Sequence, residues 1–490
     1  MQELTPKQPA ALPLSVLETY PAPDEAAINA QLAQALNSLN KKIVVLDDDP
    51  TGVQTVHNIS VYTDWSEETF RASFAEESPM FFILTNSRSM TADETRREHQ
   101  QMARRLTAAS EASGKDFILI SRSDSTLRGH YPLETETLHC TLEQCSAETG
   151  ALVHFDGEII YPFFLEGGRY TIDGVHYVKE GEQLTPAGQT EFAQDKTFGY
   201  RASYLPDWCE EKSVGTVSAA SVIHISLSEL RAGSIDTIAE KLCSARGFQK
   251  IVVDSIDYID VKVFAVAFCK AVAAGKRFLF RSAAAITKVL GGVSDQPLLT
   301  RDDLLPQVPA QQGRGLIIVG SHVNKTTRQL EALKHSRFPI AFLEFNQHLV
   351  LQEGGLKGEV ARVTALAEEQ LRAGYTCAVY TRRDRFDLDT DDKEAQLRIA
   401  TEISAALVDI VAGLAVRPDF VISKGGITSS DIGTKALRVR RATVWGQIRK
   451  SVPVWQLGEE SKFPGMPYII FPGNTGTEDD LRIAIETLMG

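Results

Sequence analysis

The stretch KIVVLDDDPTG occupies residues 42–52 and decides the fold class. Its apolar first half shows no polar alternation, which indicates a strand of a sheet that helices cover on both faces. Its second half places three aspartates and a Pro-Thr-Gly turn directly after that strand. Seven further short runs have the same Val-, Ile- and Phe-rich character: residues 81–85, 117–120, 250–253, 316–319, 377–380, 420–422 and 468–471.

Helical patterns separate these runs. One covers residues 93–110, and the capping box of residues 91–94 opens it. Alternation of strands and helices predicts an α/β protein of doubly wound, mainly parallel sheets. Residues 295–314 are rich in proline and polar residues and mark a domain boundary. We therefore expect a lead-in with a helix (1–41), a first domain (42–300) and a second domain (315–490).

Residues 156–207 interrupt the strand–helix rhythm with glycines, prolines and aromatic residues. A long irregular segment of this kind is typical of a functional insertion. We expect it to cover a site of the first domain and to lie outside the sheet.

Composition excludes several classes of protein. The 490 residues are 43% hydrophobic and 23% charged, with a formal net charge of −13. This acidic balance argues against binding nucleic acid. The six cysteines form no C-x-x-C pair, so neither a zinc site nor a disulfide framework is indicated. Neither a signal peptide nor a membrane span is evident, and the cytoplasm is the expected location. The sequence leaves open whether the chain forms a homo-oligomer.

In an open parallel sheet, ligands bind beyond the carboxyl ends of the strands. After the strand at 42–46 come Asp47, Asp48 and Asp49, whose mutual repulsion is unfavourable unless they hold a cation or accept a proton. A solvated acidic turn is the alternative explanation.

The segment SRSDSTLRGH, residues 121–130, follows the strand at 117–120. Its arginines suit a carboxylate, and its Ser, Thr and Asp side chains suit the hydroxyls of a polyol acid. It could instead be a polar helix-capping loop, and His130 could be a base or a packing residue.

Three strands of the second domain lead into glycine-containing turns before helices, at residues 320–327, 423–433 and 472–478. Glycines let a backbone approach phosphate closely, and helix starts carry partial positive charge. The first turn lacks the second glycine of a Walker loop, and no G-x-G-x-x-G dinucleotide motif is present. These turns favour a nucleotide site in this domain.

These motifs resemble those of the four-carbon acid sugar kinase family, formerly a domain family of unknown function. The family's D-D-x-T-G is similar to residues 48–52, its T-x-S-R to 85–88, and its K-x-D-S-T-L-R-G to 122–129. Its insertion motifs match residues 162–169 and 174–178. In the second half, its G-S, G-G-x-T and final G-N-x-G resemble residues 320–321, 425–428 and 473–476.

The resemblance departs from the family at two places. Arg122 replaces the commoner lysine, and Ile427 stands where many members carry an acidic residue. A guanidinium fork in place of an ammonium group changes which acid fits.

The resemblance implies a kinase that transfers a phosphoryl group from ATP, with Mg²⁺, to a hydroxyl of a four-carbon sugar acid such as a tetronate or 3-oxo-tetronate. The active site would lie in the cleft between the two domains. Asp48 or Asp49 would be the base, and the ligands of the metal are unknown. The sugar acid would contact Thr51, Arg88, Arg122, Asp124, Ser125 and Arg128. The nucleotide would contact Ser321, Gly425, Gly426, Ile427, Thr428, Gly473, Asn474 and Gly476.

Two other functions fit the same motifs. One is a nicotinamide-dependent dehydrogenase of sugar acids, although the dinucleotide motif is missing. The other is a non-catalytic sensor of nucleotide or sugar acid, which Ile427 makes conceivable.

Overall fold

The structure is a computed structural model that describes residues 9–149, 153–384, 386, 393–473 and 475–490. The chain forms two compact units. Unit 1 comprises residues 1–48 and 64–294, and unit 2 comprises residues 49–63 and 295–490. The chain thus passes from unit 1 to unit 2 directly between Asp48 and Asp49. The segment 49–63 groups with the C-terminal half, whereas the sequence placed it in the first domain.

Among the described residues, the large sheet of unit 1 has seven strands, and these strands pair with one another in parallel. In spatial order they are β10 (Ile223–Ile225), β11 (Gln249–Val253), β6 (Gly157–Tyr161), β12 (Phe278–Ser282), β5 (Phe117–Arg122), β2 (Lys42–Asp47) and β4 (Met80–Leu84). β2 and β4 are buried along their whole length, as the apolar runs predicted. The expected parallel sheet is confirmed here.

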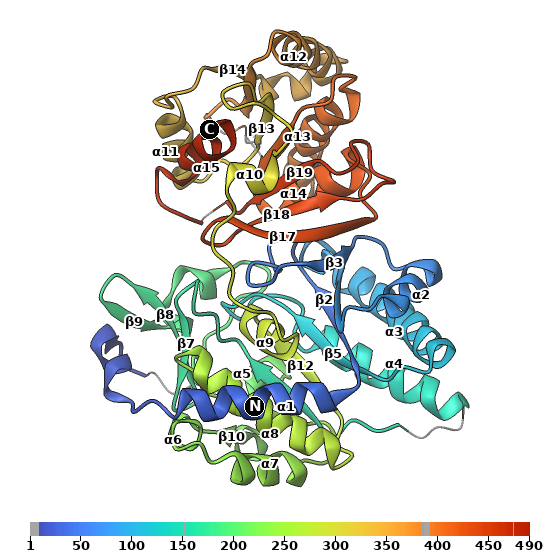
Figure 1. Cartoon of the computed structure of the whole chain (residues 1–490), viewed down its shortest axis with the longest axis vertical. Coiled ribbons are helices and arrows are strands. Elements are labelled where there is room, and N and C mark those ends of the chain that lie inside the picture. The colour runs from blue at the N-terminus through green and yellow to red at the C-terminus, as the bar shows by residue number, and fades with distance from the viewer. Residues whose placement is uncertain (1–8, 150–152, 385, 387–392, 474) are drawn as a thin grey trace. The chain divides into compact units, whose positions relative to one another are not determined.

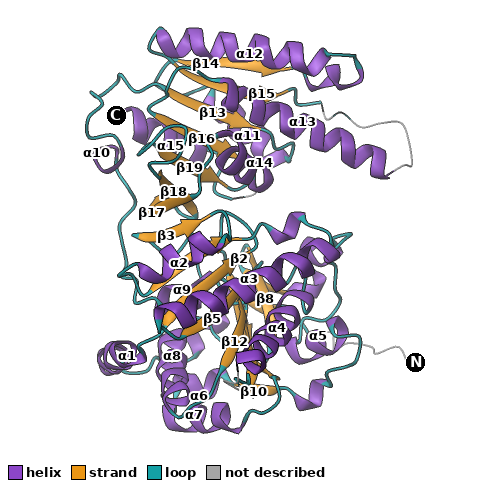
Figure 2. Ribbon diagram, turned by 90° about the vertical axis from the view of Figure 1, so that its right-hand side faces the viewer, coloured by secondary structure: helices purple, strands orange, loops and turns teal. Residues whose placement is uncertain are grey.

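Helices pack on this sheet in two groups, visible in Figures 1 and 2. α3 contacts both α2 and α4, and α8 contacts α1, α7 and α9. Thr91 caps α3 with both hydrogen bonds of a capping box, as the sequence predicted. The helices of unit 1 are α1 (Glu25–Leu39), α2 (Glu67–Ala75), α3 (Ala92–Ser113), α4 (Leu133–Thr149), α5 (Leu205–Lys212), α6 (Leu227–Arg231), α7 (Ile235–Ser244), α8 (Tyr258–Ala273) and α9 (Ala284–Leu290).

The predicted insertion is wrong at its start. Residues 157–161 form β6, which pairs in parallel with β11 and β12 inside the sheet. The sequence pattern did not predict this strand, because Gly157 and Glu158 interrupt its apolar run. The rest of the segment does leave the sheet. It contributes β7 (Arg169–Ile172), β8 (Val175–Glu180) and β9 (Gln183–Pro186), which join β1 (Leu12–Pro13) in a small antiparallel sheet.

Unit 2 combines parallel and antiparallel strands. The spatial order is β3 (Ile59–Tyr62), β17 (Arg441–Arg449), β18 (Val452–Leu457), β19 (Pro467–Phe471), β16 (Phe420–Lys424), β13 (Gly315–Val319), β15 (Thr376–Thr381) and β14 (Ile340–Phe345). The five strands from β19 to β14 are parallel, whereas β3, β17 and β18 pair antiparallel. β3 comes from segment 49–63, so this early piece of chain completes the edge of the second sheet.

The helices of unit 2 are α10 (Arg301–Leu304), α11 (Asn324–Leu333), α12 (Gly355–Arg372), α13 (Lys393–Gly413), α14 (Gly426–Asp431) and α15 (Asp480–Met489), with a π-helical turn at Ile432–Ala436 after α14. Short 3₁₀ helices occur in the two units at Leu14–Thr19, Ser87–Ser89, Ala187–Gln189, Glu191–Gln194, Ala219–Ser221 and Gln347–Leu351.

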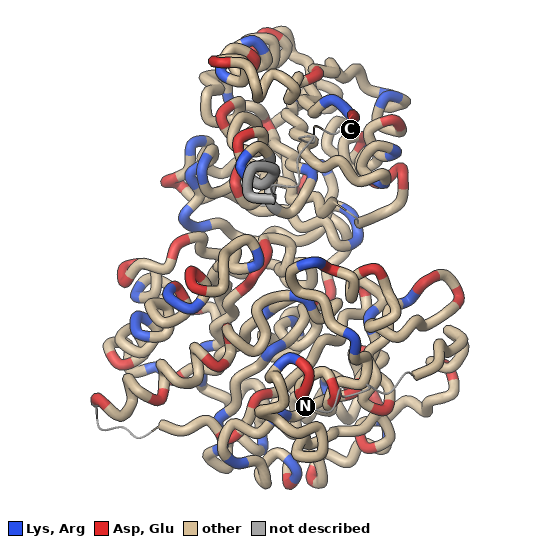
Figure 3. Tube along the Cα trace, turned by 180° about the vertical axis from the view of Figure 1, so that it is seen from behind, with Lys and Arg blue, Asp and Glu red and all other residues tan. Residues whose placement is uncertain are grey.

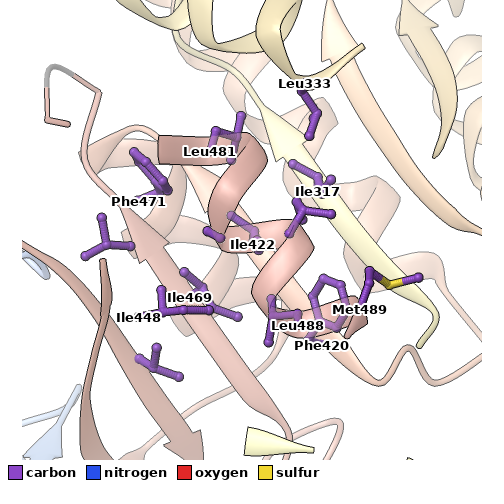
Figure 4. Close-up of a cluster of buried hydrophobic side chains, with 14 of the residues drawn as sticks. Ile317, Leu333, Phe420, Ile422, Ile448, Ile469, Phe471, Leu481, Leu488 and Met489 are labelled. Atoms are coloured by element: carbon purple, nitrogen blue, oxygen red, sulfur yellow. The ribbon is translucent and has the colours of Figure 1, made fainter. Parts of the chain in front are cut away.

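The core of unit 2 lies between the strands and α15. Figure 4 shows Leu481 and Leu488 of α15 facing Ile422 and Ile469 of the central strands, and all four are fully buried. Burial of a Leu or Ile side chain contributes about 1.5–3 kcal/mol. This packing fixes β13, β16 and β19 side by side. The loops that follow these strands are therefore held at one edge of the sheet.

Candidate functional site

The carboxyl ends of β4, β2, β5 and β12 are neighbours in unit 1, so the residues that follow these strands converge. Asp48 is the centre of this group and is only 2% exposed. Its Oδ1 accepts a hydrogen bond from Nη2 of Arg88 at 2.8 Å, and its Oδ2 accepts from Nε of the same arginine at 3.2 Å. The Oγ of Ser123 donates to Oδ2 at 2.8 Å. Both oxygens of this carboxylate are therefore engaged.

Arg122 lies beside this ion pair. Its Nη1 is 3.2 Å from Oδ1 of Asp47 and 3.7 Å from Oδ1 of Asp48. The aspartate triplet is thus split. Two of its members neutralise arginines inside unit 1, and Asp49 belongs to unit 2. The repulsion that the sequence implied is relieved by this arrangement.

Asp124 and Arg128 form a second ion pair at the same edge. Nε of Arg128 donates to Oδ2 of Asp124 at 2.7 Å, and the hydroxyl of Thr126 donates to the same oxygen. Burial raises the pKa of Asp124, but the charges of Arg128 and Arg88 outweigh burial and hold that pKa well below its usual range. Asp124 is therefore a fixed negative charge between two partly exposed arginines.

Loop 123–129 needs an unusual backbone. Leu127 and Gly129 have φ of 69° and 116°. A Cβ at Gly129 would lie 2.7 Å from Oγ of Ser123 and 3.4 Å from Oδ2 of Asp48, so glycine is required for the close approach.

Sequence reasoning missed Arg281 at the end of β12. This side chain is 1% exposed and donates to the carbonyls of Asp124 at 3.1 Å and Arg128 at 2.9 Å. Burial lowers its pKa, whereas the charges of Asp48 and Asp124 raise it. Arg281 thus holds both ends of the loop. An isolated arginine at the end of an apolar strand gave no motif by which to find it.

The predicted insertion supports this loop from the other side. Nε2 of His176 donates to the carbonyl of Ser125 at 2.8 Å, and the hydroxyl of Tyr200 donates to the carbonyl of Thr126 at 2.6 Å. Arg128 stacks over the ring of Phe192 at 5.2 Å. His130, by contrast, contacts the carbonyl of Met90 at 3.0 Å and packs edge-on against Phe198. These contacts favour the packing role for His130.

The pKa of His176 predicts how the stability of unit 1 depends on pH. It is fully buried, and burial lowers its pKa from 6.5 to about 3. Below pH 6.5 the unfolded chain binds a proton that the folded chain does not. The free energy of unfolding should therefore lose nothing to His176 above pH 6.5. It should fall by about 1.4 kcal/mol per pH unit as the pH drops from 6.5 towards 3.

Urea unfolding between pH 4.5 and 7.5 measures this loss, with His176→Gln as the matched control, since glutamine can still donate to the carbonyl of Ser125. The difference in slope between the two proteins isolates His176 from the other groups that titrate. If the free energy of unfolding falls with pH at the same slope in both proteins, the pKa of His176 is not lowered.

In unit 2, Asp49 and Thr51 form a compact turn. Oδ1 of Asp49 accepts from the N–H of Thr51 at 2.8 Å and from its hydroxyl at 2.5 Å. Oδ2 faces the start of α14, because a Cβ at Gly426 would lie 3.1 Å from it. Asp49 is half-buried. Thr51, which the sequence predicts to contact the sugar acid, lies with Asp49 in unit 2.

The predicted phosphate loops meet at the carboxyl ends of β13, β16 and β19. A Cβ at Gly320 would lie 2.8 Å from Oγ1 of Thr428, and one at Gly473 would lie 3.5 Å from Oγ of Ser321. Gly425 has φ of 123°, which only glycine adopts readily. Small residues thus let three backbones approach one another, which is the geometry that binds phosphate through N–H groups.

Gly476, another residue predicted to contact the nucleotide, also has a backbone that favours glycine. Gly476 has φ of 82°, and a Cβ there would lie 2.7 Å from Oδ2 of Asp480. The side chain of Ile427 and the whole of Asn474 lie outside the described residues.

Two cations missed by sequence reasoning flank these loops. Lys424 ends β16 and is fully buried. Arg383 follows β15, and its Nη2 donates to the carbonyl of Ser321 at 2.7 Å and to Oγ1 of Thr327 at 3.0 Å. Burial lowers the pKa of both side chains, that of Lys424 to about 7. Among the described residues, no carboxylate forms an ion pair with either side chain, and positive charge held in this way suits an anion.

The structure therefore gathers the predicted site residues into two groups. One, in unit 1, contains Asp48, Arg88, Arg122, Asp124, Ser125 and Arg128. The other, in unit 2, contains Asp49, Thr51, Ser321, Gly425, Gly426, Thr428 and Gly473. Figure 3 marks the positions of basic and acidic residues along the chain trace, and they are interspersed in both units.

Among the described helices, none combines the length and apolar character needed to cross a membrane. Within the described part of the chain, no three His, Cys, Asp or Glu side chains cluster as a ready-made metal site. Mg²⁺ bound with phosphates commonly needs only one or two protein carboxylates, so a half-buried Asp49 beside the phosphate loops fits such an ion.

Comparison with known families gives both halves a match. Residues 43–290 match the model of a sugar-binding N-terminal domain, and residues 316–481 match that of a nucleotide-binding C-terminal domain. No curated protein matches the chain.

Two solved structures share the fold. A protein of Salmonella typhimurium LT2, described as a tRNA synthase candidate, is 17% identical with a TM-score of 0.61; the match covers 91% of this chain and 98% of that one. A Haemophilus influenzae protein of the family DUF1537 is 17% identical with a TM-score of 0.56, covering 91% and 100%. At this identity the likeness concerns the fold alone.

Proposed function

Since the chain belongs to the four-carbon acid sugar kinase family, with a sugar-binding N-terminal and a nucleotide-binding C-terminal domain, we propose that it phosphorylates a hydroxyl of a small sugar acid with ATP. The observation that carries the proposal is the position of Asp49. This carboxylate lies against the Gly426 turn, among the loops best suited to phosphate. A proton acceptor beside a phosphate site is what transfer to an alcohol requires.

The sugar acid binds in unit 1. Arg88 and Arg128 are partly exposed, with 23% and 24% of their side chains accessible, and they flank the fixed charge of Asp124. Their guanidinium groups bind the carboxylate of the acid. Asp124 accepts hydrogen bonds from its hydroxyls, and Ser125 donates hydrogen bonds to them or accepts hydrogen bonds from them. Arg122 is 5% exposed and holds the aspartates in place rather than the substrate.

The nucleotide binds in unit 2, with its phosphates at Ser321, at Gly425–Thr428 and at Gly473. The closely packed glycine backbones leave room there for phosphate oxygens. ATP supplies the phosphoryl group, and Mg²⁺ neutralises the negative charge that accumulates during transfer.

Asp49, rather than Asp48, accepts the proton of the attacking hydroxyl. Arg88 and Ser123 engage both oxygens of Asp48, and this carboxylate is 2% exposed. Asp49 is half-buried and lies in the unit that binds the nucleotide. As the hydroxyl oxygen bonds to the terminal phosphorus, the bond to the leaving ADP breaks and the proton passes to Asp49. Asp48 positions Arg88.

The decisive experiment is a screen for ADP release with ATP, Mg²⁺ and a panel of four-carbon sugar acids. We expect release that depends on one or a few of these acids, and a phosphorylated acid detected by mass spectrometry. Reactions without acid and with the Asp49→Asn variant are the controls. Binding of both ligands without ADP release would indicate a sensor, and reduction of a nicotinamide cofactor without ATP would indicate a dehydrogenase.

A further inference from the structure

Lys424 is buried in an unusual way for a lysine. Its side chain has no exposed surface, and lysines are almost never fully buried unless they are paired. Nζ donates to the carbonyls of Pro472 at 2.5 Å and Gly473 at 3.1 Å. It also lies 4.3 Å from the ring centroid of Phe471, which Figure 4 shows at the end of β19. Its recorded partners are thus dipoles and an aromatic face.

These carbonyls belong to the third phosphate loop, and other side chains hold the same loop from the same side. Oγ1 of Thr326 donates to the carbonyl of Gly473 at 3.1 Å. Nε2 of Gln329 donates to the carbonyls of Thr475 at 3.0 Å and Thr477 at 2.7 Å. Both residues lie on α11. In a planar trans peptide, the C=O and the following N–H point in opposite directions. The carbonyl of Pro472, which Lys424 holds, therefore turns the N–H of Gly473 away from the lysine.

The positive charge of Lys424, like its hydrogen bonds, favours the binding of an anion at these loops. Burial, together with the nearby charge of Lys325 on α11, lowers its pKa to about 7. Among the described charged groups at the neighbouring loops are Arg383, which donates to the carbonyl of Ser321, and Asp49, which faces Gly426. A buried ammonium group gains strongly from an added anion, because the surroundings screen the attraction weakly.

We propose that Lys424 is a positioning residue that holds Pro472 and Gly473 with the N–H of Gly473 turned towards phosphate, and that nucleotide binding drives this lysine to its protonated form. The inference rests on nucleotide binding by unit 2, which is part of the proposed function. It adds a link between nucleotide affinity and pH.

The first test compares Lys424→Met with Lys462→Met. Lys462 lies in the same unit, also donates to two backbone carbonyls and also has its pKa lowered by burial, but it contacts residues 411 and 412 of α13. The probe is the magnesium complex of β,γ-methylene-ATP, measured by calorimetry. We expect Lys424→Met to weaken binding by about 10- to 100-fold, as for loss of charged hydrogen bonds. Lys462→Met should stay within about twofold.

The second test is the pH profile, which a merely structural role would not change. Above pH 7 the free protein loses the proton of Lys424, and binding must restore it. Affinity of the wild type should therefore fall by up to about tenfold per pH unit between pH 7.5 and 9. Lys424→Met should lack this fall. Thr326→Val, which removes a hydrogen bond to the loop but no charge, should keep it.

Calorimetry of the wild type at pH 8, in two buffers of different ionisation enthalpy, measures proton uptake directly and needs no variant. Absence of uptake overturns the inference, even if Lys424→Met fails to fold. So does a folded Lys424→Met protein with wild-type affinity and pH profile. If the wild type binds no nucleotide, the inference and the proposed function both fail. If it binds with proton uptake yet phosphorylates no sugar acid, only the proposed function fails.

Discussion

Asn in place of Asp49 is expected to lower kcat by about 10²–10⁴-fold, the usual contribution of a general base. The amide oxygen of asparagine can still accept the N–H of Thr51, which Asp49 accepts at 2.8 Å, so the turn should keep its shape. The amide cannot take the proton of the hydroxyl. The affinity for nucleotide and for sugar acid should therefore change only a few-fold, and the loss should fall on turnover.

Steady-state kinetics and calorimetric titration with each ligand separate these effects. Thr51→Val is the control for an altered turn. It removes the hydroxyl that donates a hydrogen bond to Asp49, but it keeps the carboxylate. We expect it to reduce kcat far less than Asp49→Asn. If Asp49→Asn retains kcat within about threefold of the wild type, Asp49 is not the base.

Replacement of Asp48 by Ala should act on the fold of unit 1. It would leave Arg88 and the nearly buried Arg122 without the carboxylate that both approach. Removal of one partner of a buried ion pair typically costs about 3–5 kcal/mol, because the other charge stays behind uncompensated. We expect a loss of this size in the free energy of unfolding, together with weak sugar-acid binding. Nucleotide affinity, which depends on unit 2, should be retained.

Urea unfolding gives the loss of stability, and hydrogen exchange of residues 117–129 locates it in unit 1. Asp236→Ala is the matched control, because Asp236 forms an ion pair with Lys270 at the surface, where such pairs contribute about 0–1 kcal/mol. A change below about 1 kcal/mol in Asp48→Ala would contradict the role given to this ion pair.

Much of the fold could be predicted because its signals are local. The apolar runs at residues 42–46 and 420–422 became β2 and β16, since continuous Val, Ile and Leu residues need cover on both faces. The capping box at Thr91 began α3. Strands with interrupted patterns were missed. β6 contains Gly157 and Glu158, and β17 alternates buried with mostly half-buried residues beside its antiparallel partners.

The candidate site shows the same division. Motifs with several polar residues in a row, such as 121–130 and 423–433, could be found because their composition differs from that of ordinary turns. Arg281 and Arg383 could not be found, nor could the burial of Lys424, which lies inside the second of these motifs. The importance of each cation comes from the carbonyls that it meets: those of Asp124, Pro472 and Ser321.

The sequence by itself determined that the chain has parallel sheets and that polar, glycine-rich loops follow their strands, because residue type and spacing act within one strand and one turn. Only the tertiary structure decided that Asp48 and Asp49, neighbours in the chain, serve different units. That division depends on which distant segments each carboxylate meets, Arg88 and Ser123 for one and the Gly426 turn for the other. Such encounters are set by the packing of whole sheets, which no local pattern encodes.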